Sequence, residues 1–219
     1  MKVLSVNVGT PKQYDWMGQA VTTSIFKSPV EGEVQVAGLD IVGDVQADLT
    51  VHGGVHKAVY VYPHEHYEYW TEHGIKPLKM GNFGENLTVE GLLEGDIHIG
   101  DELEIGSACF AVTQPRLPCY KLQVRFNRPE MTKIFWHSRR FGFYLKVVRE
   151  GSLAAGAPIN IVRRDPNAVS VADVIGLYTG DRPDGDVLRR VIAVDALPPA
   201  WREDFEQHAE KYLKASASR

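Results

Sequence analysis

Up to about residue 164, short apolar runs alternate with breaks of Gly, Asp and Pro. Within the runs, β-branched and aromatic residues recur with a period near two, which is typical of half-buried strands. The pattern predicts strands over residues 2–8, 22–27, 33–37, 58–62, 97–105, 107–113, 141–148 and 158–163. Because many short strands with few helices suit a sheet that curves back on itself, we expect residues 1–164 to form a closed or nearly closed β-barrel.

Two helices are expected to interrupt these strands. The first covers residues 64–73, begins after Pro63 and places Trp70 on an aromatic face. The second covers residues 129–138 and has Pro129 in its first turn, where the missing N–H does no harm. The body of the protein is therefore predicted to be mainly β with some α-helix.

After Arg164 the apolar residues change to the three-to-four-residue spacing of amphipathic helices. Ser170 is a good N-cap for a first helix, a second covers residues 186–194, and a third begins near Pro199. A segment this short buries too little apolar surface to be stable alone. We therefore expect residues 165–219 to form a small C-terminal three-helix module that packs on the barrel or on a partner.

Composition narrows the classes of protein that the chain can belong to. The 219 residues carry a net charge of −4, which argues against a nucleic-acid polymer held by overall charge. The two cysteines cannot form a disulfide framework, so a reducing compartment is the default. Residues 2–8 resemble a strand more than a signal peptide, and no apolar run approaches the ~20 residues of a membrane span. We expect a cytoplasmic protein without a membrane partner.

Residues 114–122 contain the most reactive-looking side chain of the sequence. Cys119 lies among Arg116 and Lys121, on a backbone with two prolines. Positive neighbours favour thiolate, the form of cysteine that attacks electrophiles and binds metals. Because proline suits neither a helix interior nor a central strand, we expect a shaped loop here. The alternative is an unreactive buried cysteine, which is what we expect for Cys109 in its apolar strand.

Two further clusters of glycine and polar residues come directly before predicted strands. In the first, the consecutive N–H groups of Gly53 and Gly54 could hold an anion, and Lys57 adds positive charge. In the second, over residues 81–88, the amide of Asn86 could bind a heterocycle edge through its donors and its acceptor. An ordinary glycine turn, and an asparagine bonded to nearby backbone, remain the alternatives.

His52 and His56 are four residues apart, a spacing that places two metal ligands on one face of a helix. Gly53 and Gly54 lie between them and disfavour a helix. We therefore expect no zinc site here and assign no role to His56.

The clusters occur together and in a fixed order, and in that combination they resemble the MOSC-domain family, most closely its YiiM-type branch. The resemblance extends over nearly the whole chain, including the three C-terminal helices. It implies a MOSC-type β-barrel with a pocket for molybdenum cofactor. The residues that carry it are Asp44-x-Gln46-Ala47-Asp48, His52-Gly53-Gly54-x-x-Lys57, Gly81-x-Phe83-Gly84-Glu85-Asn86 and Gln114-Pro115-Arg116-x-Pro118-Cys119-Tyr120-Lys121.

The resemblance also implies which residues form the site. Cys119 would be the catalytic residue and either the molybdenum ligand or a sulfur-handling residue. Arg116 and Lys121 would offset the negative charge of the cofactor, since arginine can hold a phosphate through two hydrogen bonds. The expected cofactor-binding residues are His52, Gly53, Gly54, Lys57, Asn86, Gln114, Arg116 and Lys121.

The implied activity is reduction of small N-hydroxylated substrates: 6-N-hydroxylaminopurine-type bases, hydroxylamines and amidoximes. Electrons would come from a separate reductase, a flavoprotein or similar. Two other interpretations stay open. Cys119 could carry a persulfide and pass its sulfur to an acceptor, or the protein could be a non-enzymatic cofactor carrier with the helical module as its docking surface. A homodimer is also open as the assembly.

Overall fold

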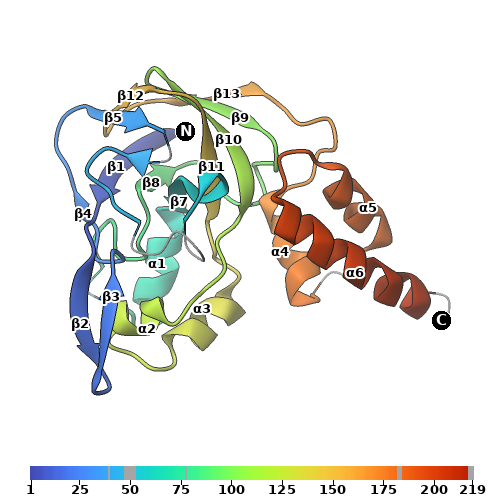
Figure 1. Cartoon of the computed structure of the whole chain (residues 1–219), viewed down its shortest axis with the longest axis horizontal. Helices are drawn as coiled ribbons and strands as arrows, with labels where there is room; N and C mark the ends of the chain where they lie inside the picture. The colour runs from blue at the N-terminus through green and yellow to red at the C-terminus, as the bar shows by residue number, and fades with distance from the viewer. Residues whose placement is uncertain (39, 47–52, 77, 182–183, 217–219) are drawn as a thin grey trace.

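The structure, a computed structural model, describes residues 1–38, 40–46, 53–76, 78–181 and 184–216, with only the backbone over 210–216. Figure 1 shows a sheet-rich body with short helices below it and three C-terminal helices at one side. None of the described helices combines the length and apolar character that a membrane crossing requires.

One eight-stranded sheet forms most of the body, in the order β13-β9-β10-β11-β7-β8-β1-β4. Its neighbours are antiparallel except for β7 and β8, which are parallel. The strands are β1 (Lys2–Val8), β4 (Ser28–Pro29), β7 (Val59–Pro63), β8 (Leu87–Glu90), β9 (Glu102–Ile105), β10 (Ala108–Pro115), β11 (Phe143–Arg149) and β13 (Ile159–Arg163).

Two smaller sheets flank the large one. Strands β2 (Lys12–Trp16) and β3 (Gln19–Thr23) form a hairpin that projects from the body in Figure 1. Strands β5 (Val34–Ala37), β6 (Asp40–Ile41) and β12 (Gly151–Leu153) pair in the order β12-β5-β6. The expectation of a β-rich body with helices is confirmed.

The large sheet nearly returns on itself, but the expected closed barrel is not found in the described part of the chain. Beside β13, the N–H of Val3 donates to the carbonyl of Ala157 at 2.9 Å, and one isolated bridge joins Lys2 to Pro158. Pro158 has no N–H to donate, so a regular ladder cannot continue through it. The order therefore keeps two ends, β13 and β4, and a few backbone hydrogen bonds join the start of β1 to residues 156–159.

Several element bounds differ from the predictions. The strand expected over 22–27 is displaced, because the N–H of Ile25 donates to Thr23 Oγ1 at 3.1 Å and β3 ends at Thr23. The strand expected over 97–105 begins only at Glu102, because Gly100 has a φ of +90° that interrupts the extended backbone.

The helices of the body agree with the sequence pattern at two of three places. Helices α1 (Glu65–Glu72) and α3 (Met131–Ser138) match the predicted 64–73 and 129–138. Helix α2 (Lys121–Phe126) was not predicted, since the prolines before it indicate a loop. It forms because Leu122 and Val124 pack into the body. The loop itself is confined to residues 116–120.

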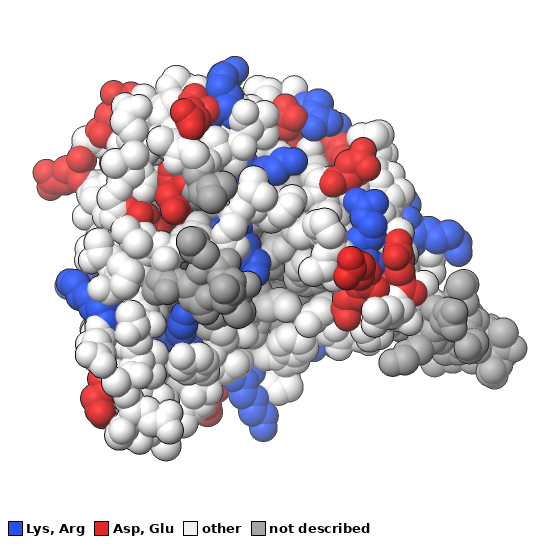
Figure 2. Space-filling model, in the orientation of Figure 1, with Lys and Arg blue, Asp and Glu red and all other residues white. Residues whose placement is uncertain are grey.

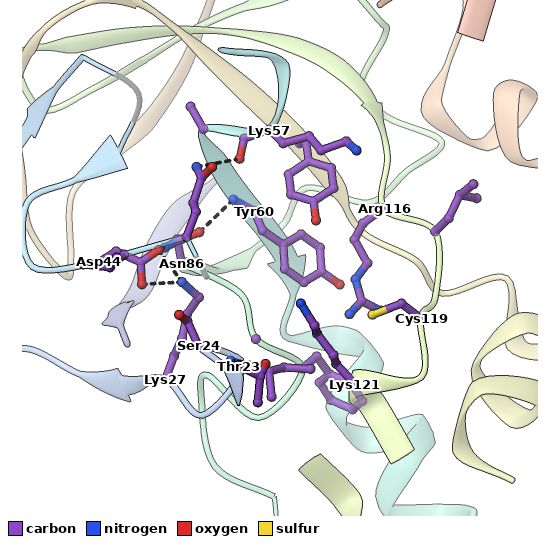
Figure 3. A pocket seen from close by; sticks show the side chains of 18 residues that line it. Thr23, Ser24, Lys27, Asp44, Lys57, Tyr60, Asn86, Arg116, Cys119 and Lys121 are labelled. Carbon is purple, nitrogen blue, oxygen red and sulfur yellow. Dashed lines mark hydrogen bonds and ion pairs between the residues drawn. The ribbon is translucent and has the colours of Figure 1, made fainter. Parts of the chain in front are cut away.

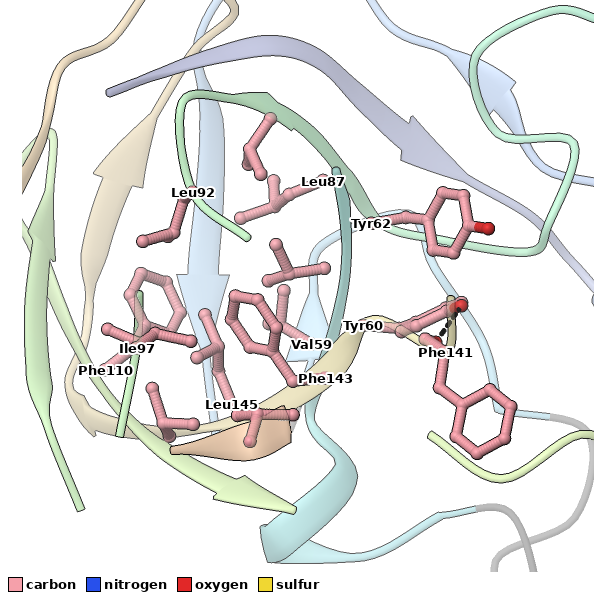
Figure 4. Packing of buried hydrophobic residues seen from close by; sticks show 14 of the residues in the cluster. Val59, Tyr60, Tyr62, Leu87, Leu92, Ile97, Phe110, Phe141, Phe143 and Leu145 are labelled. Carbon is pink, nitrogen blue, oxygen red and sulfur yellow. Dashed lines mark hydrogen bonds between the residues drawn. The ribbon is translucent and has the colours of Figure 1, made fainter. Parts of the chain in front are cut away.

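The hydrophobic core lies inside the curved sheet. Figure 4 shows Val59, Phe110 and Phe143 converging from three strands, and all three are fully buried. Burying each such side chain contributes about 1.5–3 kcal/mol to stability. A second, aromatic layer beneath the sheet joins Trp70 of α1 to Phe135 of α3, whose rings stack 5.6 Å apart. This aromatic layer packs helices α1 and α3 against the sheet.

Three helices, α4 (Val171–Thr179), α5 (Gly185–Ala193) and α6 (Pro199–Ser216), form the C-terminal part. Ser170 caps α4 as expected, in a reciprocal capping box with Asp173. The start of α4 is joined to the body by the N–H of Val171, which donates to the carbonyl of Ile97 at 3.0 Å. The domain boundary at residue 164 remains a prediction.

Candidate functional site

One pocket brings residues from all three sequence clusters together. It opens beside β7 and is bordered by the loop after β10 and by residues 23–27 and 44–46 (Figure 3). Of the expected site residues, the lining includes Lys57, Asn86, Arg116, Cys119 and Lys121. Segments far apart in the sequence therefore meet at one cavity, as the order of the motifs led us to expect.

Arg116 forms the inner end of one wall. It is only 6% exposed, and its Cζ lies 5.4 Å from the ring centroid of Tyr60 and 5.3 Å from that of Phe135. Within the described residues, Nη1 of this guanidinium has no hydrogen-bond partner. A buried N–H group without an acceptor is costly. The wall is thus built to receive an acceptor or an anion.

Cys119 lies beside this guanidinium. Figure 3 shows the Cys119 sulfur next to the Arg116 nitrogens, with the amino group of Lys121 also pointing into the cavity. Cys119 is a free thiol and is partly exposed, whereas Cys109 is buried on β10. The surroundings of Cys119 are therefore those of an accessible sulfur among positive charges.

The opposite wall is a closed network around Asp44. This carboxylate pairs with Lys27, accepts the N–H of Gly9 at 2.7 Å and accepts Nδ2 of Asn86 at 2.8 Å. Burial lowers the pKa of Lys27, and the neighbouring Asp44 partly opposes this. Oδ1 of Asn86 also accepts the N–H of Tyr60 at 3.0 Å. Asn86 is thus bonded within the protein, and a ligand would compete with these partners.

Positive charge exceeds negative charge in this lining. Lys27, Lys57, Arg116 and Lys121 face one carboxylate, Asp44, which gives four positive charges against one negative. Burial lowers the pKa of Lys57. Because Lys27 is paired with Asp44, the remaining excess comes from the other three side chains. Figure 2 shows blue and red side chains interspersed over this face of the molecule, so the excess is local to the pocket.

The remaining predicted site residues are not part of this lining. Gln114 is buried on β10, and the N–H of Gly54 donates to Oε1 of Gln46 at 3.2 Å. Gly53 lies just before the short 3₁₀ helix η1 (Val55–Lys57), and His52 lies outside the described residues. A φ of +96° explains the glycine at position 54. The anion-binding role of this turn remains a prediction.

The glycine cluster over residues 81–86 shapes the loop beneath the pocket. Glu85 is fully buried and accepts the N–H groups of Gly81 at 2.9 Å and Phe83 at 3.0 Å. Burial raises the pKa of Glu85. A Cβ at Gly84 would lie 2.7 Å from Ile25 Cγ1, so the loop and the segment after β3 pack too closely for a larger residue. The motif is therefore structural at these positions.

Sequence reasoning missed most of the other residues of the pocket, and three polar ones matter here: Ser24, Lys27 and Asp44. Lys27 and Ser24 lie in a segment that the pattern assigns to a strand, and Asp44 was only part of a motif. Ser24 Oγ is buried without a hydrogen-bond partner among the described residues. A lysine followed by Ser28-Pro29 is too common a sequence to indicate a site. In the described part of the chain, no three His, Cys, Asp or Glu side chains gather as metal ligands.

Comparisons with known proteins identify relatives over most of the chain. A family model for the MOSC domain matches residues 48–160. Uncharacterized protein YflK of Bacillus subtilis is 37% identical over 211 residues, which are 96% of each chain. Protein YiiM of Escherichia coli is 31% identical over 188 residues, which are 84% of each chain.

One relative is much longer than this chain. A Gibberella moniliformis protein named Reductase is 31% identical over 176 residues, which are 78% of this chain and 31% of that protein. Among solved structures, YiiM from Geobacillus stearothermophilus matches with a TM-score of 0.79 at 35% identity, and the match covers 95% of this chain and 98% of that one.

Proposed function

The chain belongs to the MOSC domain family, and on this premise we propose that its pocket binds molybdenum cofactor and that the protein reduces N-hydroxylated substrates. The family and its YiiM-type relatives were expected from the motifs, and this expectation is confirmed. The observation that carries the proposal is the pairing of the accessible Cys119 sulfur with the buried, incompletely bonded Arg116 guanidinium.

The residues of the pocket fit the proposed cofactor. Molybdenum cofactor is an anionic pterin with a phosphate and two sulfur donors, and the pocket has an excess of positive charge. Arg116 Nη1 and Ser24 Oγ are two buried polar atoms without partners among the described residues, as expected of a cavity that takes a polar occupant. Thiolate is the soft donor that suits a polarizable metal centre, and Cys119 would supply it.

Each residue then has a distinct role in holding the group. Lys57 and Lys121 would hold the phosphate end, as point charges that tolerate some variation in geometry. Arg116 would keep negative charge next to the Cys119 sulfur. When bound, the cofactor supplies two-electron oxygen-transfer chemistry, while the protein supplies position and electrostatics.

The proposed reaction is reductive cleavage of an N–O bond. A substrate R–NHOH takes up two electrons and two protons, the N–O bond breaks, and the products are R–NH₂ and water. The electrons come from a separate reductase. A relative named Reductase supports the reaction class, and because this chain matches 31% of its length, that protein has a large additional portion. Bases such as 6-N-hydroxylaminopurine are the proposed substrates.

The test uses protein purified from a host that makes molybdenum cofactor. Molybdenum per protein is measured by mass spectrometry, and turnover of 6-N-hydroxylaminopurine is followed with a chemically reduced viologen as the electron source. We expect Cys119→Ser to abolish turnover and lower the molybdenum content, while Cys109→Ser leaves both near wild type. An active, metal-loaded Cys119→Ser variant contradicts the proposal.

Sulfur transfer is the second candidate, because a guanidinium next to an accessible cysteine would also stabilise an anionic persulfide. A persulfide adds one sulfur atom, about 32 Da, to the cysteine. Sulfur transfer would be favoured if intact-mass analysis finds this adduct on Cys119 in protein without molybdenum. Molybdenum binding without any turnover would instead indicate a cofactor carrier.

A further inference from the structure

Helix α3 contacts both reactive side chains of the pocket from behind. Oγ1 of Thr132 donates to the carbonyl of Cys119 at 3.2 Å. Three residues later, the ring of Phe135 lies 5.3 Å from Cζ of Arg116. Residues three apart lie on one face of a helix, so a single face of α3 reaches both the cysteine and the arginine.

This helix is held rigidly by its own packing. Phe135 is fully buried, and its ring stacks on Trp70 at 5.6 Å and on Phe141 at 5.7 Å. At its far end, Trp136 meets Tyr178 of α4 edge-on at 6.1 Å. A side chain projecting from such an element is a firmer support than one on a loop.

The carbonyl of Cys119 is fixed from two directions. It accepts the hydrogen bond of Thr132 and also the N–H of Leu122, at 3.1 Å, from the start of α2. Because a cysteine has one side-chain torsion, fixing its backbone leaves the sulfur only the few staggered positions. On the other side, the Arg116 guanidinium lies over the rings of both Tyr60 and Phe135, which limit the space into which it can turn.

We propose that Thr132 and Phe135 are positioning residues that keep the Cys119 sulfur and the Arg116 guanidinium facing each other. The inference rests on the proposed function of Cys119, but it concerns the protein alone and can be tested without cofactor. Neither side chain is part of the pocket lining, so both act through the residues they contact.

The test compares two alkylating agents on cofactor-free protein. Iodoacetate is an anion and iodoacetamide is neutral, and both react with the thiolate, so the ratio of their rate constants cancels the thiolate fraction. What remains is the attraction of an anion by the positive charge beside the sulfur. Modification of Cys119 is followed by peptide mass spectrometry, and the buried Cys109 is the internal control in the same sample.

Arg116→Ala removes the positive charge beside the sulfur, so its iodoacetate-to-iodoacetamide ratio is the lower limit expected for the other variants. We expect Thr132→Val to lower the iodoacetate-to-iodoacetamide ratio about threefold, toward the Arg116→Ala value, because the charge contact weakens as the sulfur and the guanidinium lose their fixed orientation. A threefold change corresponds to about 0.65 kcal/mol. Thr132→Ser retains the hydroxyl and should keep the wild-type ratio. Phe135→Leu, which keeps an apolar core residue, should lower the ratio as well.

Two outcomes overturn the inference. One is a wild-type ratio in both Thr132→Val and Phe135→Leu, and the other is an Arg116→Ala protein whose ratio equals that of the wild type. If Thr132→Val fails to fold, the Phe135→Leu variant alone decides: a wild-type ratio in it overturns the inference. A protein that never takes up molybdenum but shows the expected ratios refutes the proposed function and leaves the positioning roles standing.

Discussion

The two walls of the pocket bury charge in different ways. On one wall, the Asp44 carboxylate is bonded to Lys27, to Asn86 and to the backbone of Gly9. On the other, Arg116 is equally buried but keeps Nη1 without an acceptor among the described residues. A complete network stabilises the empty protein, whereas an incomplete one costs stability until a partner arrives. The Asp44 wall is therefore part of the scaffold, and the Arg116 wall is the one that the proposed function uses as its binding surface.

The largest expected effect comes from breaking the complete wall. Asp44→Ala leaves the Lys27 ammonium buried without its carboxylate, and loss of one partner of a buried pair costs about 3–5 kcal/mol. The free energy of unfolding in urea measures this. Glu90→Ala is the matched control, because it breaks the half-exposed Lys2–Glu90 pair and should cost at most about 1 kcal/mol. Equal losses in the two variants would show that the Asp44 network is not special.

Arg116→Met should behave in the opposite way. The variant loses stacking on two rings but no longer buries an incompletely bonded cation, so the cofactor-free protein should change by no more than about 1 kcal/mol. Molybdenum content after purification should fall sharply. A cofactor-free protein as unstable as Asp44→Ala would mean that Arg116, too, is a structural residue.

A smaller effect should appear in the pH dependence of stability. Burial raises the pKa of Asp40 to about 6, although the hydrogen bond from Gln46 opposes this and nearby Asp44 adds to it. Between pH 3.8 and about 6, the Asp40 carboxyl is therefore protonated in the folded protein but ionised in the unfolded chain. The stabilisation is complete below that lower value and is lost as the pH rises through about 6.

Unfolding free energies measured at several pH values across this window should show the decline for the wild type. Because Asp40 is about half buried, the contribution should stay below about 1 kcal/mol after screening by solvent. Asp40→Asn keeps an acceptor for Gln46 but cannot titrate, so its profile should be flatter. Identical profiles for the two proteins would rule out Asp40 as the source.

The smallest effect is expected at Ser24. Its hydroxyl has no partner among the described residues, so Ser24→Ala should leave the cofactor-free protein unchanged or stabilise it by about 0.5 kcal/mol. Neighbouring Thr23 accepts the N–H of Ile25, and Thr23→Val should cost about 1 kcal/mol. Thermal unfolding of both variants compares an unused hydroxyl with a bonded one. A loss at Ser24 as large as that at Thr23 would reveal a partner for it.

The sequence predicts one wall of this pocket better than the other. Cys119, Arg116 and Lys121 are neighbours in the chain, so their chemistry is visible as a motif. The pair Lys27–Asp44 joins residues 17 positions apart, and Asn86 reaches Asp44 across 42 positions. No local pattern encodes such contacts, because they depend on how the sheet brings its segments together.

The same distinction applies to the fold. The sequence pattern identifies β7 and β10 well, since both are buried strands that appear as continuous runs of apolar and β-branched residues. It fails at β3 and α2, where a side chain-to-backbone hydrogen bond and the burial of Leu122 decide the outcome. A closed or nearly closed barrel was expected from the number of strands; closure is not found in the described residues, and the proline at position 158 limits the last pairing.

The pairing of the N-terminal strand with the far end of the sheet has a consequence for synthesis. The carbonyl of Met1 accepts the N–H of Ile159, and the N–H of Val3 donates to Ala157. Strand β1 can pair with β4 and β8 earlier, but these two hydrogen bonds can form only after residues 157–159 have been made. Contacts so distant in the chain form slowly. Until these residues are made, the edge of β1 that they cover stays open, and an open sheet edge is where chaperones can act.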